Sequence, residues 1–147
     1  SLDGGGASAS FRLNKLQKVD IFSPNETETA LITGIRPDTL DDCLRASMAI
    51  CSQTAVGYVV LKLGARGCYI YDGKYCDLIA PFDVQAVDTT AAGDAFTAAL
   101  ATEFLRTGDI TASARYANAV GALTVTTAGA INALPTRETV RRFLEQI

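Results

Sequence analysis

The chain has 147 residues and a formal net charge of −3, with 48% hydrophobic and 20% charged residues. This composition is typical of a soluble globular domain, and an isoelectric point near 4.8 excludes the strongly basic surface by which proteins bind nucleic acids. No apolar run approaches the roughly 20 residues that span a bilayer. From the charge and from this lack of a long apolar run, we expect neither a nucleic-acid nor a membrane partner.

The sequence contains no histidine. A Ser-His-Asp triad, a histidine zinc site and a histidine proton shuttle are therefore excluded within this chain. A general base must be a carboxylate or, as a weaker alternative, a lysine, cysteine or tyrosine. The four cysteines show neither CxxC nor metal-ligand spacing, and the first ten residues do not resemble a signal peptide. We therefore expect reduced, mostly buried thiols and a cytoplasmic protein.

The first third of the chain predicts alternating strands and helices. Residues 1–3 resemble the end of a strand that runs into a glycine loop, and the apolar run Val19–Ser23 predicts a buried strand. Asn25, with Glu28 three positions later, predicts the start of a helix, and Gly34 predicts its end.

A second helix is expected after Asp38, which we predict as its N-cap. Its buried face is predicted by residues at helical spacing, namely Leu40, Leu44, Met48 and Cys51. Val56–Leu63 is nearly all apolar and β-branched, as in a strand covered on both faces. It runs into the glycine turn Gly64–Gly67, and a hairpin follows, with Cys68–Tyr71 and Lys74–Ile79 flanking Asp72-Gly73.

The second half predicts one more strand and three helices. Phe82–Val87 is predicted to be a strand, followed by a helix to about Arg106 and another over about residues 110–126. The last helix is expected to begin near Thr136, with an apolar stripe of Val140, Phe143, Leu144 and Ile147. The alternation of strands and helices favours a layered α/β domain with a largely parallel sheet.

The segment Asp88–Asp94 carries the strongest chemical signal. A strand end, two threonines, small residues and a glycine lead into a helix, whose first N–H groups and dipole favour a phosphate or a developing anion. Asp94, in the first helical turn, is the obvious proton acceptor beside such a group. The alternative is a small-residue turn in which the aspartate only stabilises the helix start.

These residues also resemble a known family. VDTTAAGDAFTAAL (Val87–Leu100) is similar to the C-terminal signature of the PfkB carbohydrate kinases, and Ala91 at its first glycine position is similar to the ribokinase members. Three further segments resemble the family in order and spacing: SPNETETALITG (Ser23–Gly34), VVLKLGARGCYIYDG (Val59–Gly73) and ALPTRETVRRFLEQ (Ala133–Gln146).

The resemblance implies a ribokinase-like (Rossmann-like) three-layer α/β/α fold, truncated to its C-terminal nucleotide-binding and catalytic half over residues 1–147. The N-terminal sugar-binding half and lid of the family are not recognisable in the sequence. The implied activity is ATP-dependent phosphorylation of a sugar hydroxyl, first of all that of ribose to ribose 5-phosphate. The 147-residue chain alone is expected to be inactive. Fructose, 2-keto-3-deoxygluconate or a nucleoside as acceptor, a non-catalytic nucleotide-binding regulator and a ligand-free α/β domain remain alternatives.

By the same resemblance Asp94 is the general base, and the backbone N–H groups of Ala92, Gly93 and Asp94 form an anion hole. The implied ATP or ADP site consists of Asn25, Lys62, Gly64, Gly67, Gly93 and Asn118. Glu28 is implied to organise Mg²⁺ through water, and a K⁺ site is implied at Asp88, Thr90, Thr124, Thr127 and Gly129.

Bland alternatives stand beside several of these assignments. Asn25 and Glu28 are also the residues of a plain capping box. Lys62 can be an ordinary lysine at a strand end, and Asn118 an ordinary polar residue on a helix. Ala133 departs from the family, whose ribokinases tend to carry a hydroxyl residue there, which puts one ligand of the cation site in doubt. The implied partners are a sugar and ATP, with a homodimer for the full-length protein.

Overall fold

The computed structural model describes residues 2–3, 19–128 and 134–147. The chain divides into two compact units, Ser1–Leu78 and Ile79–Ile147. The predicted glycine loop after residue 3 and the positions Gly129 and Ala133 lie outside the described residues. In the described part, no helix is both long and apolar enough to cross a membrane.

The first unit is built on a five-stranded sheet of order β1-β2-β3-β4-β5. Its strands are β1 (Leu2–Asp3), β2 (Ile21–Ser23), β3 (Tyr58–Lys62), β4 (Cys68–Tyr71) and β5 (Cys76–Ile79). The pairings β1–β2 and β2–β3 are parallel, whereas β3–β4 is antiparallel. The predicted parallel character therefore holds for the first three strands. The short turn after β3 cannot form the long crossover that another parallel strand requires.

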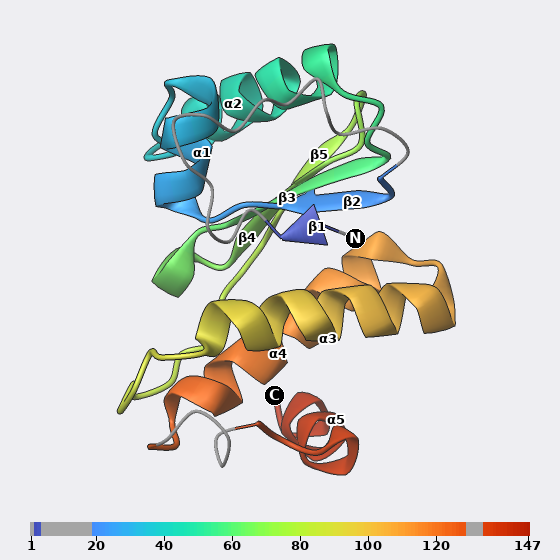
Figure 1. Cartoon of the computed structure of the whole chain (residues 1–147). Coiled ribbons are helices and arrows are strands. Elements are labelled where there is room, and N and C mark those ends of the chain that lie inside the picture. The colour runs from blue at the N-terminus through green and yellow to red at the C-terminus, as the bar shows by residue number, and fades with distance from the viewer. Residues whose placement is uncertain (1, 4–18, 129–133) are drawn as a thin grey trace. The chain divides into compact units, whose positions relative to one another are not determined.

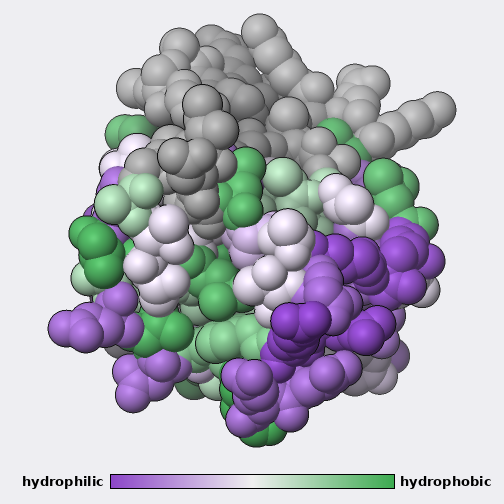
Figure 2. All heavy atoms as spheres, turned by 90° about the horizontal axis from the view of Figure 1, so that it is seen from below, coloured by the Kyte–Doolittle hydropathy of each residue, from purple (hydrophilic) through white to green (hydrophobic). Residues whose placement is uncertain are grey.

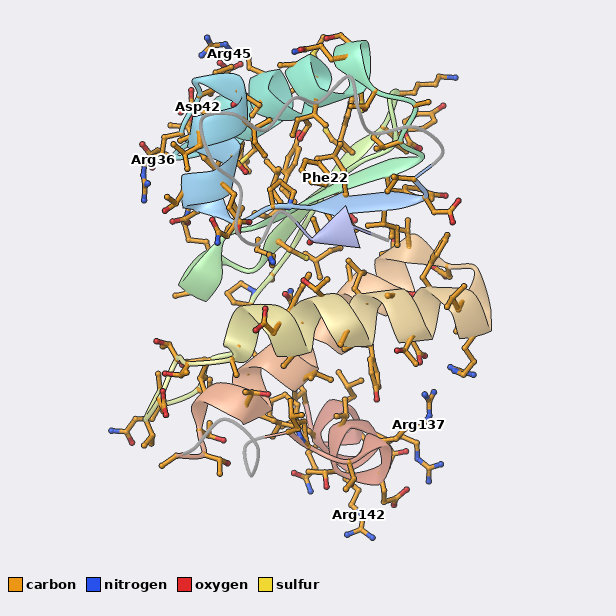
Figure 3. All side chains as sticks on the ribbon, in the orientation of Figure 1. Phe22, Arg36, Asp42, Arg45, Arg137 and Arg142 are labelled. Atoms are coloured by element: carbon orange, nitrogen blue, oxygen red, sulfur yellow. The ribbon has the colours of Figure 1, made fainter. Side chains whose placement is uncertain are left out.

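Two helices, α1 (Glu26–Thr33) and α2 (Leu40–Gln53), cover one face of this sheet (Figure 1). Phe22 of β2 is fully buried and lies on the face that the helices cover (Figure 3). It packs in one core cluster with buried residues of α2, β3 and β4, namely Cys43, Ile50, Val59, Leu61, Tyr69 and Tyr71, together with Leu63. The continuous apolar run of β3 is buried, as the sequence predicts.

The predicted N-cap of α2 was wrong, and its predicted buried face holds in part, since Leu44 and Cys51 pack against the core cluster whereas Leu40 and Met48 are exposed. Thr39, not Asp38, caps the helix, and it forms a capping box with Asp42. The buried residues of α2 are Cys43, Ala46, Ser47 and Ile50, whereas Leu40 and Met48 are 57% and 50% exposed. Both sets of residues have helical spacing, so the sequence pattern alone does not distinguish them. The small residues of the buried set allow α2 to approach the sheet closely.

The second unit consists of α3 (Ala92–Thr107), α4 (Ile110–Val125) and α5 (Arg137–Glu145). α3 and α4 lie side by side as a helical hairpin (Figure 1). Its two-residue connection begins at Gly108, whose φ of 70° is left-handed. Val140 of α5 packs with Ala95, Ala119 and Val120. The predicted stripe of α5 holds for its first three members, but Ile147 is 67% exposed because the helix ends before it.

The expected strand over Phe82–Val87 is absent from this unit, which was a wrong prediction. The segment has no regular structure, and the N–H groups of Val87 and Asp88 both donate to the carbonyl of Val125, at 2.7 and 3.0 Å. Phe82 serves helix packing instead, since its ring meets that of Phe143 edge-on with centroids 5.2 Å apart, whereas Val87 is exposed.

A buried carboxylate ties α5 to α3. Glu103 of α3 accepts hydrogen bonds from Arg106 and from Arg137 of α5, the latter at 3.0 Å. These arginines, Arg106 first, hold the pKa of Glu103 below its usual value. Arg137 also lies over the Tyr116 ring, 5.5 Å from its centroid. The side of α5 that carries the ion pairs of Arg141 and Arg142 is exposed to solvent. Figure 2, which shows the molecule from below the view of Figure 1, has many hydrophilic side chains gathered on one side.

The cysteine prediction holds in part. All four cysteines are free. Cys43 and Cys68 are buried and Cys51 is half-buried, but Cys76 is exposed on β5. Burial raises the pKa of the Cys43 and Cys51 thiols, which makes them unreactive at neutral pH.

Candidate functional site

The start of α3 has the geometry that the sequence predicts for Asp88–Asp94. The helix begins at Ala92 with Asp94 in its first turn. Ala91 caps it with φ +66°, the one non-glycine residue with positive φ in the described part of the chain. α1, α2, α4 and α5 each have a capping side chain, but α3 has none among the described residues. No side chain among the described residues therefore accepts from its N-terminal N–H groups.

The backbone donors at this helix start differ in their use. The N–H of Ala92 donates to the carbonyl of Thr89 at 3.3 Å, and that of Ala95 donates to Ala91 at 2.9 Å. The N–H groups of Gly93 and Asp94 have no acceptor among the described residues. Two of the three expected anion-hole donors are thus available, and the third makes a long bond within the turn.

Asp94 is exposed, and its carboxylate makes no hydrogen bond or ion pair with a described residue. It is therefore accessible to a ligand at the helix start. The preceding turn is held by Asp88, whose Oδ1 accepts the N–H of Thr90 at 2.8 Å. Such a turn orders the backbone that leads into the helix.

The left-handed conformation of Ala91 leads to a testable prediction. Ala91→Gly is expected to stabilise the protein by up to about 1.5 kcal/mol in urea unfolding. Glycine removes the Cβ clash of the left-handed conformation, which costs alanine roughly 1–2 kcal/mol. From this gain about 0.4–1 kcal/mol is subtracted, because glycine has more conformational entropy in the unfolded chain. The control Ala98→Gly, at an exposed site inside the same helix, is expected to destabilise by about 1 kcal/mol. Equal destabilisation by both changes would contradict the prediction.

The residues expected to bind a monovalent cation come together in part. The bonds from Val87 and Asp88 to the Val125 carbonyl place the backbone of Asp88 at the carboxyl end of α4, the helix that carries Thr124. The Thr124 hydroxyl is buried and donates to the Val120 carbonyl at 2.7 Å. The described residues contain no group of three or more Cys, Asp or Glu side chains that could hold a metal.

Asn118 has an internal role. Its side chain is buried, and the amide nitrogen donates to the carbonyls of Ile79 and Ala80, both at 3.1 Å. The side chain thus fastens Ile79 and Ala80, the first residues of the second unit, to α4. Its contact with adenine stays a prediction.

In the first unit, the carboxyl ends of β2 and β3 bring Asn25 and Lys62 together. These residues form an isolated parallel bridge, and the N–H of Lys62 donates to the Pro24 carbonyl at 2.9 Å. The capping box of α1 is present: Asn25 Oδ1 accepts the N–H of Glu28, and the Glu28 carboxylate accepts the N–H of Asn25, both at 2.8 Å. Glu28 is buried, and Asn25 is exposed.

A glycine turn follows β3 at the same edge of the sheet. Gly64–Arg66 form a single 3₁₀ turn, with φ +57° at Gly64. Gly67 has φ +89° and ψ −137°, a conformation that only glycine adopts readily. The N–H groups of Gly64 and Ala65 find no acceptor among the described residues, as expected for a turn that binds phosphate oxygens.

Sequence reasoning missed one residue of this turn. The Arg66 guanidinium donates to the carbonyls of Pro37 and Asp38 and to the carboxylate of Glu26. The carbonyl acceptors lie 28 and 29 residues away in sequence, and a carbonyl leaves no trace in residue type. The only local signal was an arginine between two glycines.

The predicted site residues therefore form two groups. Asn25, Glu28, Lys62 and the glycine turn belong to the first unit, whereas Asp88, Asp94 and Asn118 belong to the second. Each group is assembled within its own unit. The convergence of the two groups on one ligand stays a prediction.

Comparisons with known proteins show which family the chain resembles along its length. The family model described as pfkB family carbohydrate kinase matches residues 9–137. A ribokinase of Haemophilus influenzae is 34% identical over 130 residues, which cover 88% of this chain and 42% of the relative. The structure of Arabidopsis thaliana ribokinase complexed with ribose and ATP has a TM-score of 0.89 and 33% identity, and covers 98% of this chain and 46% of that one.

A fructokinase variant of Vibrio cholerae, solved with fructose, ADP and potassium ion, has a TM-score of 0.72 and 28% identity, and covers 85% of this chain and 40% of that one. The chain thus spans less than half the length of each of these relatives. The matches extend along nearly all of this chain, so the likeness concerns the whole of it and not one motif.

Proposed function

Because the chain belongs to the pfkB family of carbohydrate kinases, we propose that it is the C-terminal nucleotide-binding and catalytic-base half of an ATP-dependent sugar kinase that phosphorylates ribose. The observation that carries this proposal is the start of α3, where free N–H groups of Gly93 and Asp94 lie beside an accessible carboxylate. The similar Arabidopsis ribokinase, which binds ribose and ATP, supports the choice of substrates.

In the proposed reaction, Asp94 accepts the proton of the sugar hydroxyl as its oxygen forms a bond to the γ-phosphorus and the bond from that phosphorus to ADP breaks. The N–H groups of Gly93 and Asp94 and the α3 dipole stabilise the charge on the transferring phosphoryl group. Phosphoryl transfer depends mainly on such positioning and electrostatic stabilisation. Gly64 and Gly67 leave room for the nucleotide phosphates to approach the backbone of their turn.

Two ions fit the residues present. The Glu28 carboxylate uses one oxygen for the Asn25 N–H, which leaves acceptor capacity for water bound to Mg²⁺. For K⁺, the ordered Asp88 turn beside the end of α4 would supply oxygen ligands, and the similar Vibrio cholerae fructokinase was solved with potassium. The ions would neutralise phosphate charge and order the loop before α3. A homodimer and a cytoplasmic location stay predictions.

The proposal is tested by measuring ADP release from the full-length kinase with ribose, deoxyribose and fructose as acceptors. Ribose is expected to give the highest kcat/KM. A higher value with fructose would favour the second candidate, a fructokinase, to which the likeness to the Vibrio cholerae enzyme points. Nucleotide binding without turnover on any sugar would indicate a regulator instead. The 147-residue chain alone is expected to bind ADP weakly and to phosphorylate negligibly, since the family's sugar-binding half is not recognisable in it.

A further inference from the structure

Arg66 makes the longest-range polar contacts of the glycine turn. One terminal nitrogen donates to the Asp38 carbonyl at 2.8 Å. The other donates to the Pro37 carbonyl at 2.6 Å and to Oε1 of Glu26 at 2.9 Å. Three acceptors from two other segments of the first unit therefore meet one side chain. The contact with Glu26, before any other cause, raises the pKa of Arg66, so the guanidinium remains charged.

These contacts join the two halves of the predicted nucleotide site in this unit. Glu26 is the first residue of α1 and lies between Asn25 and Glu28, which form the capping box. Pro37 and Asp38 lead into α2. Among the described residues, three backbone hydrogen bonds close the turn itself, from Leu63 to Gly67, from Arg66 to Leu63 and from Gly67 to Gly64, at 2.9, 3.0 and 3.2 Å.

A turn with two glycines at positive φ is not rigid by itself, because glycine has many alternative conformations. The side chain of Arg66 is the one group in the turn that reaches another segment through charged hydrogen bonds, within the described part of the chain. Charged hydrogen bonds of this kind are roughly twice as strong as neutral ones. They therefore limit how far the turn can move from the start of α1.

We propose that Arg66 is a positioning residue for nucleotide binding, which holds the Gly64–Gly67 turn against the start of α1 so that its free N–H groups keep the orientation that binds phosphate. This inference rests on the proposed function, because it assigns Arg66 to the same nucleotide site. In this proposal Arg66 does not contact the nucleotide itself. Its effect passes through the backbone of the turn.

The chain offers a matched control in Arg36. This arginine also pairs with Glu26, at 3.4 Å, and is 53% exposed compared with 42% for Arg66. It lies at the outer surface of the unit (Figure 3) and has no contact with the glycine turn among the described residues. Arg36→Gln therefore removes a charge from the same ion-pair network and leaves the turn intact.

Arg66→Gln, Arg66→Lys and Arg36→Gln are to be compared in the full-length protein. Hydrogen exchange is to be followed at the amides of residues 63, 66 and 67, which donate hydrogen bonds within the turn. Without nucleotide, their exchange is expected to accelerate at least about tenfold in Arg66→Gln. The Kd for ADP and the KM for ATP are expected to rise about tenfold, as for the loss of one charged hydrogen bond, with the sugar KM unchanged. Arg66→Lys keeps the charge but cannot reach three acceptors, so intermediate values are expected. Arg36→Gln is expected to stay within twofold of wild type.

The proposal would be overturned if hydrogen exchange of the turn were unchanged in Arg66→Gln. It would also be overturned if exchange were faster but Arg66→Gln bound ADP as tightly as Arg36→Gln does. Equal effects of Arg36→Gln would also overturn it, because the loss would then belong to Glu26. A wild-type protein that binds no nucleotide would contradict the proposed function instead. In that case the exchange rates alone still decide whether Arg66 restrains the turn.

Discussion

Replacing Asp94 by asparagine in the full-length kinase is expected to lower kcat by about 10²–10⁴-fold, the usual contribution of a general base. Asparagine is nearly isosteric and keeps the free N–H groups at the start of α3, but it cannot accept the hydroxyl proton. The nucleotide Kd is expected to change little or to fall slightly, since one negative charge near the γ-phosphate is lost.

The competing role of Asp94, stabilisation of the helix start, predicts the opposite pattern. It would give a loss of about 0.3–1 kcal/mol in stability and near-normal turnover. Asp109→Asn is the matched control, because Asp109 is also exposed and also lies at a helix start, where it caps α4 through the N–H of Ala112. Steady-state kinetics, ADP binding and melting of both variants separate the roles. Turnover of Asp94→Asn within about threefold of wild type would remove Asp94 from the mechanism.

Phe22→Ala is expected to lower the free energy of unfolding by about 3–5 kcal/mol, as measured by urea denaturation. The ring is fully buried between β2 and the helices, and its removal leaves a cavity among Ile50, Val59 and Leu61. Because β2 leads directly to Asn25, weaker nucleotide binding is expected to accompany the loss.

Two controls define this effect. Phe22→Leu keeps most of the volume and is expected to cost about 1.5 kcal/mol or less. Leu31→Ala removes an equally apolar but half-exposed side chain of α1 and is expected to stay within about 0.5 kcal/mol of wild type. A Phe22→Ala loss as small as that of Leu31→Ala would mean that the core cluster is not the main support of the first unit.

Several features of the fold could be predicted because their causes lie close together in sequence. The Asn25–Glu28 capping box needs only residues three positions apart, and it is present. The helix start at Asp94 follows from a glycine-containing turn before an alanine-rich segment. The buried strand β3 follows from its continuous apolar run. In each case the local preference and the tertiary structure agree.

Features that depend on distant partners could not be predicted. Only Leu44 and Cys51 of the predicted buried face of α2 pack against the core, because the sheet, and not the spacing of apolar residues, selects which side of the helix is covered. The expected strand over Phe82–Val87 is replaced by hydrogen bonds to the Val125 carbonyl, 38 and 37 residues further along the chain for Val87 and Asp88. A β propensity is easily overridden by such contacts.

The sequence by itself determined the family, the helix start that carries Asp94 and the glycine turn, because these depend on residue types at short, fixed spacings. Only the tertiary structure decided what surrounds them. It joined Asn25 to Lys62 at the ends of two parallel strands, engaged the Asn118 amide with backbone carbonyls, and brought Pro37, Asp38 and Glu26 to Arg66. The physical reason is that backbone carbonyls are present at every residue, so which of them a side chain meets depends on how the chain folds.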